Sequence, residues 1–213
     1  KNKNQIGEKI ENTSGGITFS LDDKYIFYSK LDENHRPREI YRHEIGTPTS
    51  KDILIFKEES EAFTVGIGLS SDEKYFFITS SDHNTSEQYY FKADEIIPKP
   101  KLIDKRKRGI IYSVNSWNDN FYKHTNEDAE DFKIEKTNDL EKKEWETFIP
   151  AREEVLIGGL IFLNDWIIRS ETSNALSKLI LRNPKNDEEE EIFFSDEKVI
   201  VPGVSLTQRD RNT

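Results

Sequence analysis

Apolar residues in this chain come in short runs of about four to seven residues, and polar turns separate the runs. Runs of this length that are rich in Ile, Val, Phe and Tyr are typical of β-strands. The stretches between them contain Asp-Asp, Asp-Asn, Asn-Pro and Gly, which favour turns. No window has a long apolar stripe with the 3.6-residue period of a helix. The pattern therefore predicts an all-β protein.

One landmark, a polar turn followed by an aromatic apolar run, occurs four times along the chain. Its aromatic residues are spaced by 50, 46 and 45 residues, at Tyr25, Tyr75, Phe121 and Trp166. Each repeat contains four expected strands in the same order. In the first repeat these strands cover residues 16–19, 25–29, 39–45 and 52–57.

Four short strands every 45 to 50 residues is the spacing of a β-propeller blade. We therefore expect a partial β-propeller of about four four-stranded antiparallel blades. The expected blades cover residues 15–61, 62–108, 109–153 and 154–198, and residues 199–213 start a further blade with a strand over 199–205.

An incomplete propeller leaves the apolar faces of its end blades uncovered. Either these faces pair with another chain, or the natural protein contains more blades, which we favour. The chain lacks Met even at position 1, as expected for a piece of a longer polypeptide. For the isolated chain we expect self-association or limited solubility.

The amino-acid composition excludes several kinds of functional site and disfavours several kinds of ligand. The 213 residues contain no Cys, which excludes a disulfide framework, a thiolate metal site and a cysteine nucleophile. The net charge of −10 disfavours binding to nucleic acid or an anionic membrane and favours cationic ligands. No apolar run is long enough to span a membrane, and no secretory signal is recognised at the N-terminus.

Particular segments resemble a known family. The stretch over 40–56, with its Arg-His-x-x-Gly-Thr-Pro segment at 42–48, is similar to the propeller of prolyl oligopeptidase-family serine peptidases. Within that family it most resembles the oligopeptidase B (protease II) branch. The similarity continues through residues 85–87, 149–154 and 165–166.

The resemblance implies a two-domain cytoplasmic enzyme, in which a seven-bladed propeller covers an α/β-hydrolase domain that carries Ser, Asp and His. Members of this branch cleave short peptides after Arg or Lys, and the propeller restricts access to the active site. Short basic peptides would be the substrates of the parent protein.

The catalytic residues themselves are not expected in this chain. An α/β-hydrolase needs a Gly-x-Ser-x-Gly elbow, and the nearest string, Gly203-Val-Ser205-Leu-Thr207, lacks the final Gly and lies on an expected strand. We therefore predict no catalytic, cofactor-binding or metal-binding residue, no cofactor, and an inactive 213-residue chain.

Other polar groups favour structural interpretations. The spacing of His35, His43, His83 and His124 matches no compact metal site. The basic run at 105–108 and the acidic run at 188–191 are interpreted as solvated connections.

The remaining polar and aromatic patterns are also assigned to the fold. Acidic or Asx pairs at 22–23, 72–73 and 118–119 are expected to fix turns. Glycine pairs at 15–16 and 158–159 are expected to relieve crowding at inner strands. Core positions between blades are expected for Trp117, Trp145 and Trp166.

Two alternatives remain open. The chain could be a stand-alone propeller-like interaction module without enzymatic activity. A propeller glycosidase would need carboxylates that converge on one bond, and no residue in the sequence points to such a pair.

Overall fold

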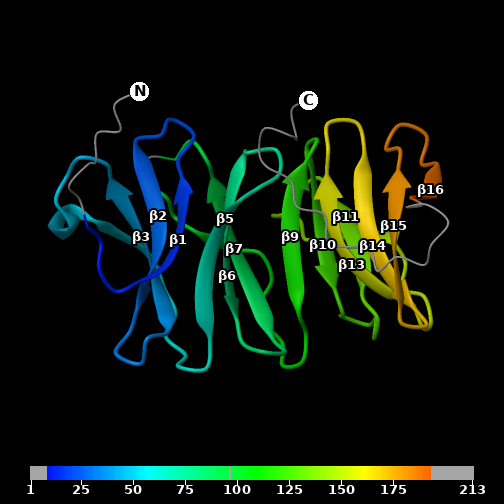
Figure 1. The fold of residues 1–213 in the computed structure, drawn as a ribbon, viewed down its shortest axis with the longest axis horizontal. Coiled ribbons are helices and arrows are strands. Elements are labelled where there is room, and N and C mark those ends of the chain that lie inside the picture. The colour runs from blue at the N-terminus through cyan, green and yellow to red at the C-terminus, as the bar shows by residue number, and fades with distance from the viewer. Residues whose placement is uncertain (1–8, 96, 193–213) are drawn as a thin grey trace. The chain divides into compact units, whose positions relative to one another are not determined.

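The structure is a computed structural model that describes residues 9–95 and 97–192. Within these residues, sixteen strands form four antiparallel sheets of four strands, and in each sheet the strands lie side by side in chain order (Figure 1). The one helix in this part of the chain is the short 3₁₀ helix η1 (Thr49–Lys51), and no helix there is long and apolar enough to cross a membrane. The predicted all-β fold of four four-stranded sheets is confirmed.

The first two sheets lie in the N-terminal part of the chain. Sheet 1 consists of β1 (Thr13–Phe19), β2 (Tyr25–Leu31), β3 (Pro37–Glu44) and β4 (Ile53–Lys57). Sheet 2 consists of β5 (Thr64–Leu69), β6 (Tyr75–Ser81), β7 (Ser86–Lys92) and β8 (Lys101–Leu102).

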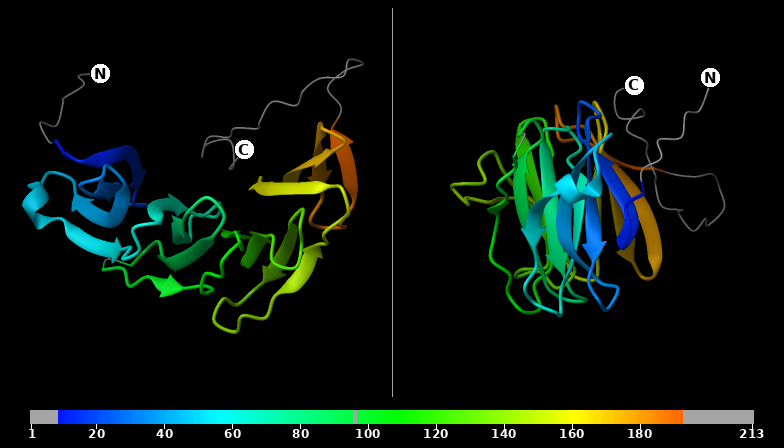
Figure 2. Two further views of the ribbon diagram at one scale, coloured as in Figure 1. Left: turned by 90° about the horizontal axis from the view of Figure 1, so that it is seen from below. Right: turned by 90° about the vertical axis from the view of Figure 1, so that its left-hand side faces the viewer.

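The other two sheets are also built from four strands that are consecutive in the chain. Figure 2 shows the ribbon in two further orientations. Sheet 3 consists of β9 (Tyr112–Trp117), β10 (Asn120–Thr125), β11 (Lys133–Thr137) and β12 (Glu146–Ile149). Sheet 4 consists of β13 (Leu156–Phe162), β14 (Ile167–Ser173), β15 (Leu176–Arg182) and β16 (Glu189–Ile192). The strand predicted over 199–205 lies outside the described residues.

Short polar side chains close the first turns, as expected. In the β1–β2 turn, Ser20 Oγ donates to Asp22 Oδ1 at 2.7 Å, and the same carboxylate oxygen accepts the backbone N–H of the residue two positions on. Asp72 repeats this geometry in the β5–β6 turn. The β9–β10 turn differs, because Asn118 and Asp119 instead adopt positive φ angles of 48° and 58°, as a tight hairpin requires.

The chain divides into two compact units, residues 1–116 and 117–213. In the first unit, an apolar layer lies between sheets 1 and 2. The buried residues of this layer are Phe27, Ile40, Val65, Phe76, Ile78 and Phe91. The rings of Phe27 and Phe76 lie 4.7 Å apart in it. Alternate residues of β2, β3, β5, β6 and β7 supply the layer, as the two-residue period of strands requires.

The second unit has its own apolar cluster. Its buried residues are Trp117, Tyr122, Ile134, Ile149, Ile157, Phe162 and Ile167. The core position predicted for Trp117 is confirmed, since its ring stacks on Phe162 at 5.4 Å. The same prediction is wrong for Trp166, which is 36% exposed because it lies in the β13–β14 turn before the strand begins. Trp145 is half-buried, and the Lys123 ammonium lies 4.4 Å from its ring centroid.

Crowding explains only one of the glycines at the inner strands. A Cβ on Gly158 would overlap the side chain of Ser170, whereas a Cβ on Gly16 or Gly159 would meet nothing within 4 Å. Gly15 has open space too, but its φ of +86° is a conformation that glycine adopts without strain. The packing interpretation therefore holds for Gly158 and is wrong for the other three.

Candidate functional site

The histidines do not form a site. His35 and His83 lie in exposed turns, whereas His43 and His124 are each engaged inside their own unit. Nowhere in residues 9–95 and 97–192 do three or more His, Asp or Glu side chains cluster as a metal ion would need.

Two donors share one buried carboxylate in sheet 1. His43 Nδ1 lies 2.7 Å from Asp52 Oδ1, and the Tyr28 hydroxyl donates to Asp52 Oδ2 at 2.8 Å. The side chains of His43 and Asp52 are 1% and 3% exposed. Burial, together with the adjacent Asp52 carboxylate, raises the pKa of Tyr28 well above its usual range.

One residue of the Arg-His-x-x-Gly-Thr-Pro segment, His43, belongs to this cluster. His43 comes from β3 and Tyr28 from β2, while Asp52 immediately follows η1 in the β3–β4 connection. The shared carboxylate therefore ties that connection to two central strands. The structure places His43 at a packed strand position, where the sequence left packed and solvent-facing positions both open.

A second buried cluster centres on Arg106, a member of the basic run at 105–108. Arg106 Nη2 lies 3.0 Å from both carboxylate oxygens of Glu58 and 3.2 Å from Glu87 Oε1. Its guanidinium also lies 4.0 Å from the ring centroid of Phe63. The two carboxylates are only 3% and 4% exposed. The interpretation of the whole run as solvated charge is therefore wrong at Arg106, which neutralises two buried acids.

The arrangement also sets the protonation of Glu58. Burial alone would raise its pKa, but hydrogen bonds from Ser80 Oγ and Arg106 outweigh burial and hold the pKa below its ordinary value. Glu58 follows β4 and Arg106 follows β8. One guanidinium therefore fastens the connections that leave sheets 1 and 2.

Side chains at 85–88 join sheet 2 to β9. Ser86 Oγ donates to the carbonyl of Tyr112 and accepts its backbone N–H, both at 2.7 Å. Gln88 Oε1 accepts the N–H of Val114 at 2.6 Å, and Thr85 Oγ1 accepts the N–H of Gly109. Two residues of the Thr-Ser-Glu sequence that carries the resemblance, Thr85 and Ser86, thus hydrogen-bond sheet 2 to the segment that contains β9.

The second unit contains a longer ion-pair network. The Arg169 guanidinium makes two 2.6 Å hydrogen bonds to Glu189 and a third, at 2.7 Å, to the buried Glu171. Arg152 also donates to Glu171, and Arg182 to Glu189. The acidic run at 188–191 is therefore not uniformly solvated, because Glu189 is bound by two arginines.

His124 links two strands of the second unit. Its Nε2 lies 2.7 Å from the carbonyl oxygen of Ile157 on β13, and its ring stacks on Phe132 at 4.5 Å. Burial lowers the pKa of this imidazole, so the neutral form with a proton on Nε2 fits the contact.

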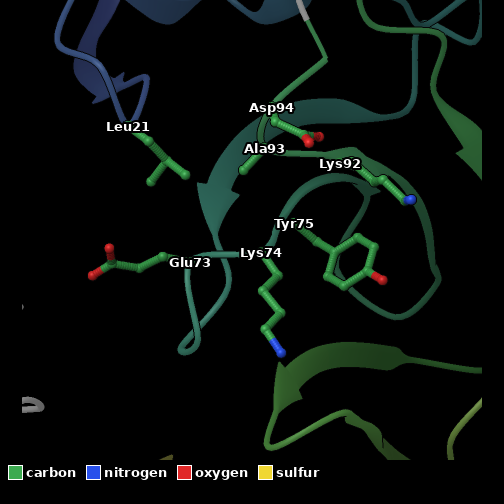
Figure 3. Close-up of a pocket in the computed structure, with 7 residues that line it drawn as sticks. All are labelled: Leu21, Glu73, Lys74, Tyr75, Lys92, Ala93 and Asp94. Atoms are coloured by element: carbon green, nitrogen blue, oxygen red, sulfur yellow. The ribbon is translucent and has the colours of Figure 1, made fainter.

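One shallow pocket of about 330 Å³ opens between sheets 1 and 2 (Figure 3). Leu21 from the β1–β2 turn faces Glu73 and Lys74 of the β5–β6 turn across it, and Ala93 and Asp94 follow β7. Its charged rim contains two acidic and two basic side chains, and no nucleophile–base pair lines it. Across the described residues, these buried polar groups thus hold the connections between strands together.

Sequence and structure comparisons show the family of this chain. The family described as prolyl oligopeptidase, N-terminal β-propeller domain matches residues 1–212. Protease 2 of Moraxella lacunata is 35% identical over 63% of this chain, and dipeptidyl aminopeptidase BI of Pseudoxanthomonas mexicana is 28% identical over 94%. The chain spans 21% and 28% of the length of these curated relatives.

Solved structures show the same fold. Oligopeptidase B from Trypanosoma brucei, with covalently bound antipain, superposes with a TM-score of 0.84 at 24% identity. Oligopeptidase B from Leishmania major gives 0.83 at 18% identity. In both, 91% of this chain matches 29% of the larger protein.

Proposed function

Because this chain belongs to the N-terminal β-propeller domain family of prolyl oligopeptidases, we propose that it is the substrate-gating portion of a serine oligopeptidase. The parent protein would hydrolyse short peptides after Arg or Lys, in an α/β-hydrolase domain outside these 213 residues. The role of this portion would be steric, since it would admit short unstructured peptides and exclude folded proteins.

The observation that carries the proposal is the family match over residues 1–212. All four described sheets lie inside that range, and the named relatives are peptidases. The sequence holds no Gly-x-Ser-x-Gly elbow, so chemistry has to come from another part of the parent. We also propose the blade limits 15–61, 62–108, 109–153 and 154–198, with a further blade starting at 199.

The decisive experiment uses the native polypeptide that contains this sequence. Immunoblotting of source cells gives its size, and the purified protein is assayed with short fluorogenic peptides that present Arg, Lys or Pro before the scissile bond. We expect the immunoblot to show a band far larger than 24.9 kDa, and we expect the purified protein to cleave the peptides after Arg and Lys. A large peptidase that prefers Pro would keep the gating role and overturn the basic specificity.

The stand-alone alternative gives a different result. A band at 24.9 kDa without peptidase activity in the purified material would favour an interaction module. Light scattering would then test self-association, which we propose for the isolated chain because its end sheets offer apolar surface. If the isolated chain stayed monomeric over a wide concentration range, the proposed self-association would be wrong.

The net charge of −10 supports a second component of gating. A negative field raises the encounter rate of cationic peptides, and added salt screens it. We expect kcat/KM for a dibasic peptide to fall with ionic strength while that for a neutral peptide stays constant. Equal salt dependence for both peptides would exclude steering. A cytoplasmic location, also implied by the resemblance, is tested by cell fractionation.

A further inference from the structure

Arg42 is a buried cation for which sheet 1 provides no counter-charge. It is 8% exposed, and its Nε and Nη1 atoms are buried without a hydrogen-bond acceptor. Within the part of the chain that the structure describes, no carboxylate lies at ion-pair distance from it. A guanidinium stays charged at any physiological pH, and a buried charge without a partner is strongly unfavourable.

The position of Arg42 follows from the strand register. Arg42 lies opposite Phe27 on β2 and Ile53 on β4. Since Phe27 belongs to the apolar layer between sheets 1 and 2, Arg42 is on the face of sheet 1 that turns toward sheet 2. Its guanidinium lies 4.2 Å from the ring centroid of Tyr25, a contact that offsets only part of the cost of burial.

The same end of this layer is open. Tyr25 begins β2, and its carbonyl accepts the N–H of Ser20, which closes the turn that contains Leu21. Leu21 lines the pocket of Figure 3 together with Ala93 of sheet 2. Arg42, opposite Phe27, thus lies two residue pairs inward from the Tyr25–Glu44 pair at the end of the layer where the pocket opens.

We propose that Arg42 binds a carboxylate group that enters the layer between sheets 1 and 2 at this end. A guanidinium presents paired N–H donors that match the two oxygens of a carboxylate. Because Nε and Nη1 lie on opposite edges of the guanidinium, a carboxylate on the Nε–Nη2 edge would give the orphaned Nε its acceptor. The pocket rim carries Glu73 and Asp94 beside Lys74 and Lys92. Its acids repel a doubly charged phosphate more strongly than a singly charged carboxylate.

The carboxylate has two conceivable sources with the same chemistry. It belongs either to an acidic side chain elsewhere in the parent polypeptide or to a separate peptide. Without the carboxylate, the charge of Arg42 would lower the stability of the chain, and binding of the carboxylate would restore it. Such a loss of stability is common at binding sites.

The first test is an NMR titration of the 213-residue chain with sodium acetate, against sodium chloride at the same ionic strength. The Nε–H resonance of Arg42 is identified by its loss in Arg42→Met. We expect a saturable shift of this resonance with acetate and none with chloride. An Arg42 signal that does not respond, or an identical response to both salts, overturns the proposal.

Urea unfolding provides the second test and separates binding from packing. In chloride, Arg42→Met should raise the unfolding midpoint, because it removes an uncompensated charge. Acetate should raise the midpoint of the unaltered chain and of Arg108→Met, an exposed control, but not that of Arg42→Met. A lowered midpoint for Arg42→Met in chloride, with acetate acting equally on all three proteins, would show that Arg42 only packs.

The source of the carboxylate is assigned by two further titrations. A short peptide with a free C-terminus is compared with its C-terminal amide on the same chain. Acetate is also added to the native parent polypeptide. A response to the free peptide alone indicates a peptide ligand. A response of the isolated chain but not of the parent indicates an acidic side chain of the parent. Failure of the peptidase assay would leave these binding results unaffected.

Discussion

The imidazole of His43 and the carboxylate of Asp52 form a hydrogen bond of 2.7 Å that solvent hardly reaches. The bond joins the third strand of sheet 1 to the connection that follows it. Because Tyr28 donates to the same carboxylate, one acidic group satisfies two buried donors. Its removal would take this acceptor away from both donors.

Asp52→Ala should therefore destabilise the protein by about 3 kcal/mol, since a buried hydrogen-bonded group loses its charged partner. Tyr28→Phe removes one donor and leaves the His43 contact intact, so about 1 kcal/mol is expected. Urea unfolding monitored by tryptophan fluorescence measures both changes. Equal costs for the two variants would contradict the shared role of Asp52.

Arg106→Ala should be much more harmful than Arg108→Ala, although the two arginines belong to one basic run. The first variant leaves Glu58 and Glu87 buried without their counter-ion and should cost about 3 kcal/mol. Arg108 is exposed, so its loss should change stability by less than about 0.5 kcal/mol. The urea unfolding midpoints of the two variants test this prediction. Similar midpoints would contradict the role of Arg106 as the counter-ion of Glu58 and Glu87.

The pKa of Glu58 gives the Arg106 cluster a pH dependence. Its folded-state pKa lies below the ordinary value of 4.5, so the unfolded chain takes up a proton first as the pH falls. The stabilisation is complete above pH 4.5 and is lost as the pH drops toward the folded-state pKa. Glu58→Gln should show a weaker loss of stability between pH 5 and about pH 3 than the unaltered chain. An unchanged pH profile would argue against the ionised cluster.

His124 should make the second unit sensitive to milder acid. Burial lowers its pKa from the ordinary 6.5, so on acidification the unfolded state binds a proton before the folded state does. Stability should therefore decrease as the pH falls below 6.5. His124→Gln should reduce the difference between urea midpoints at pH 7.5 and pH 5.5. The matched variant at exposed His83, His83→Gln, should retain the full difference.

The adjacent glycines of β13 provide a matched pair. Gly158→Ala introduces a methyl group against Ser170 and should cost about 1–3 kcal/mol. Gly159→Ala places the same group in open space and should cost less than about 1 kcal/mol. Adding Ser170→Ala should recover part of the loss at Gly158. No recovery would mean that the strain comes from the backbone and not from the Ser170 hydroxyl.

Local sequence was sufficient for the strands and their grouping, because the two-residue period and turn residues act within one hairpin. The Ser20–Asp22 and Ser70–Asp72 turns are an example, since each depends on groups two residues apart. Trp166 shows where this fails. An aromatic residue beside a strand is a good core candidate, but the strand starts one residue later and leaves the ring at the surface.

The buried ion pairs could not be predicted in the same way. Glu58 and Arg106 are 48 residues apart, and a charge run looks the same in sequence whether its members are solvated or buried. Arg169 and Glu189 likewise depend on how strands of sheet 4 pair. The burial of Arg42 without a counter-ion could not be predicted from the sequence either, because it depends on which residues lie near Arg42 in the folded chain.

Each sheet consists of four strands that are consecutive in the chain, and this has a consequence for synthesis on the ribosome. Every hydrogen-bonded pair within a sheet closes over a short length of chain, so a sheet can assemble as soon as its fourth strand has emerged. Arg106 is translated after the strands of sheet 2, and its arrival would complete the neutralisation of two acids already in place. We therefore expect folding to advance sheet by sheet from the N-terminus during translation.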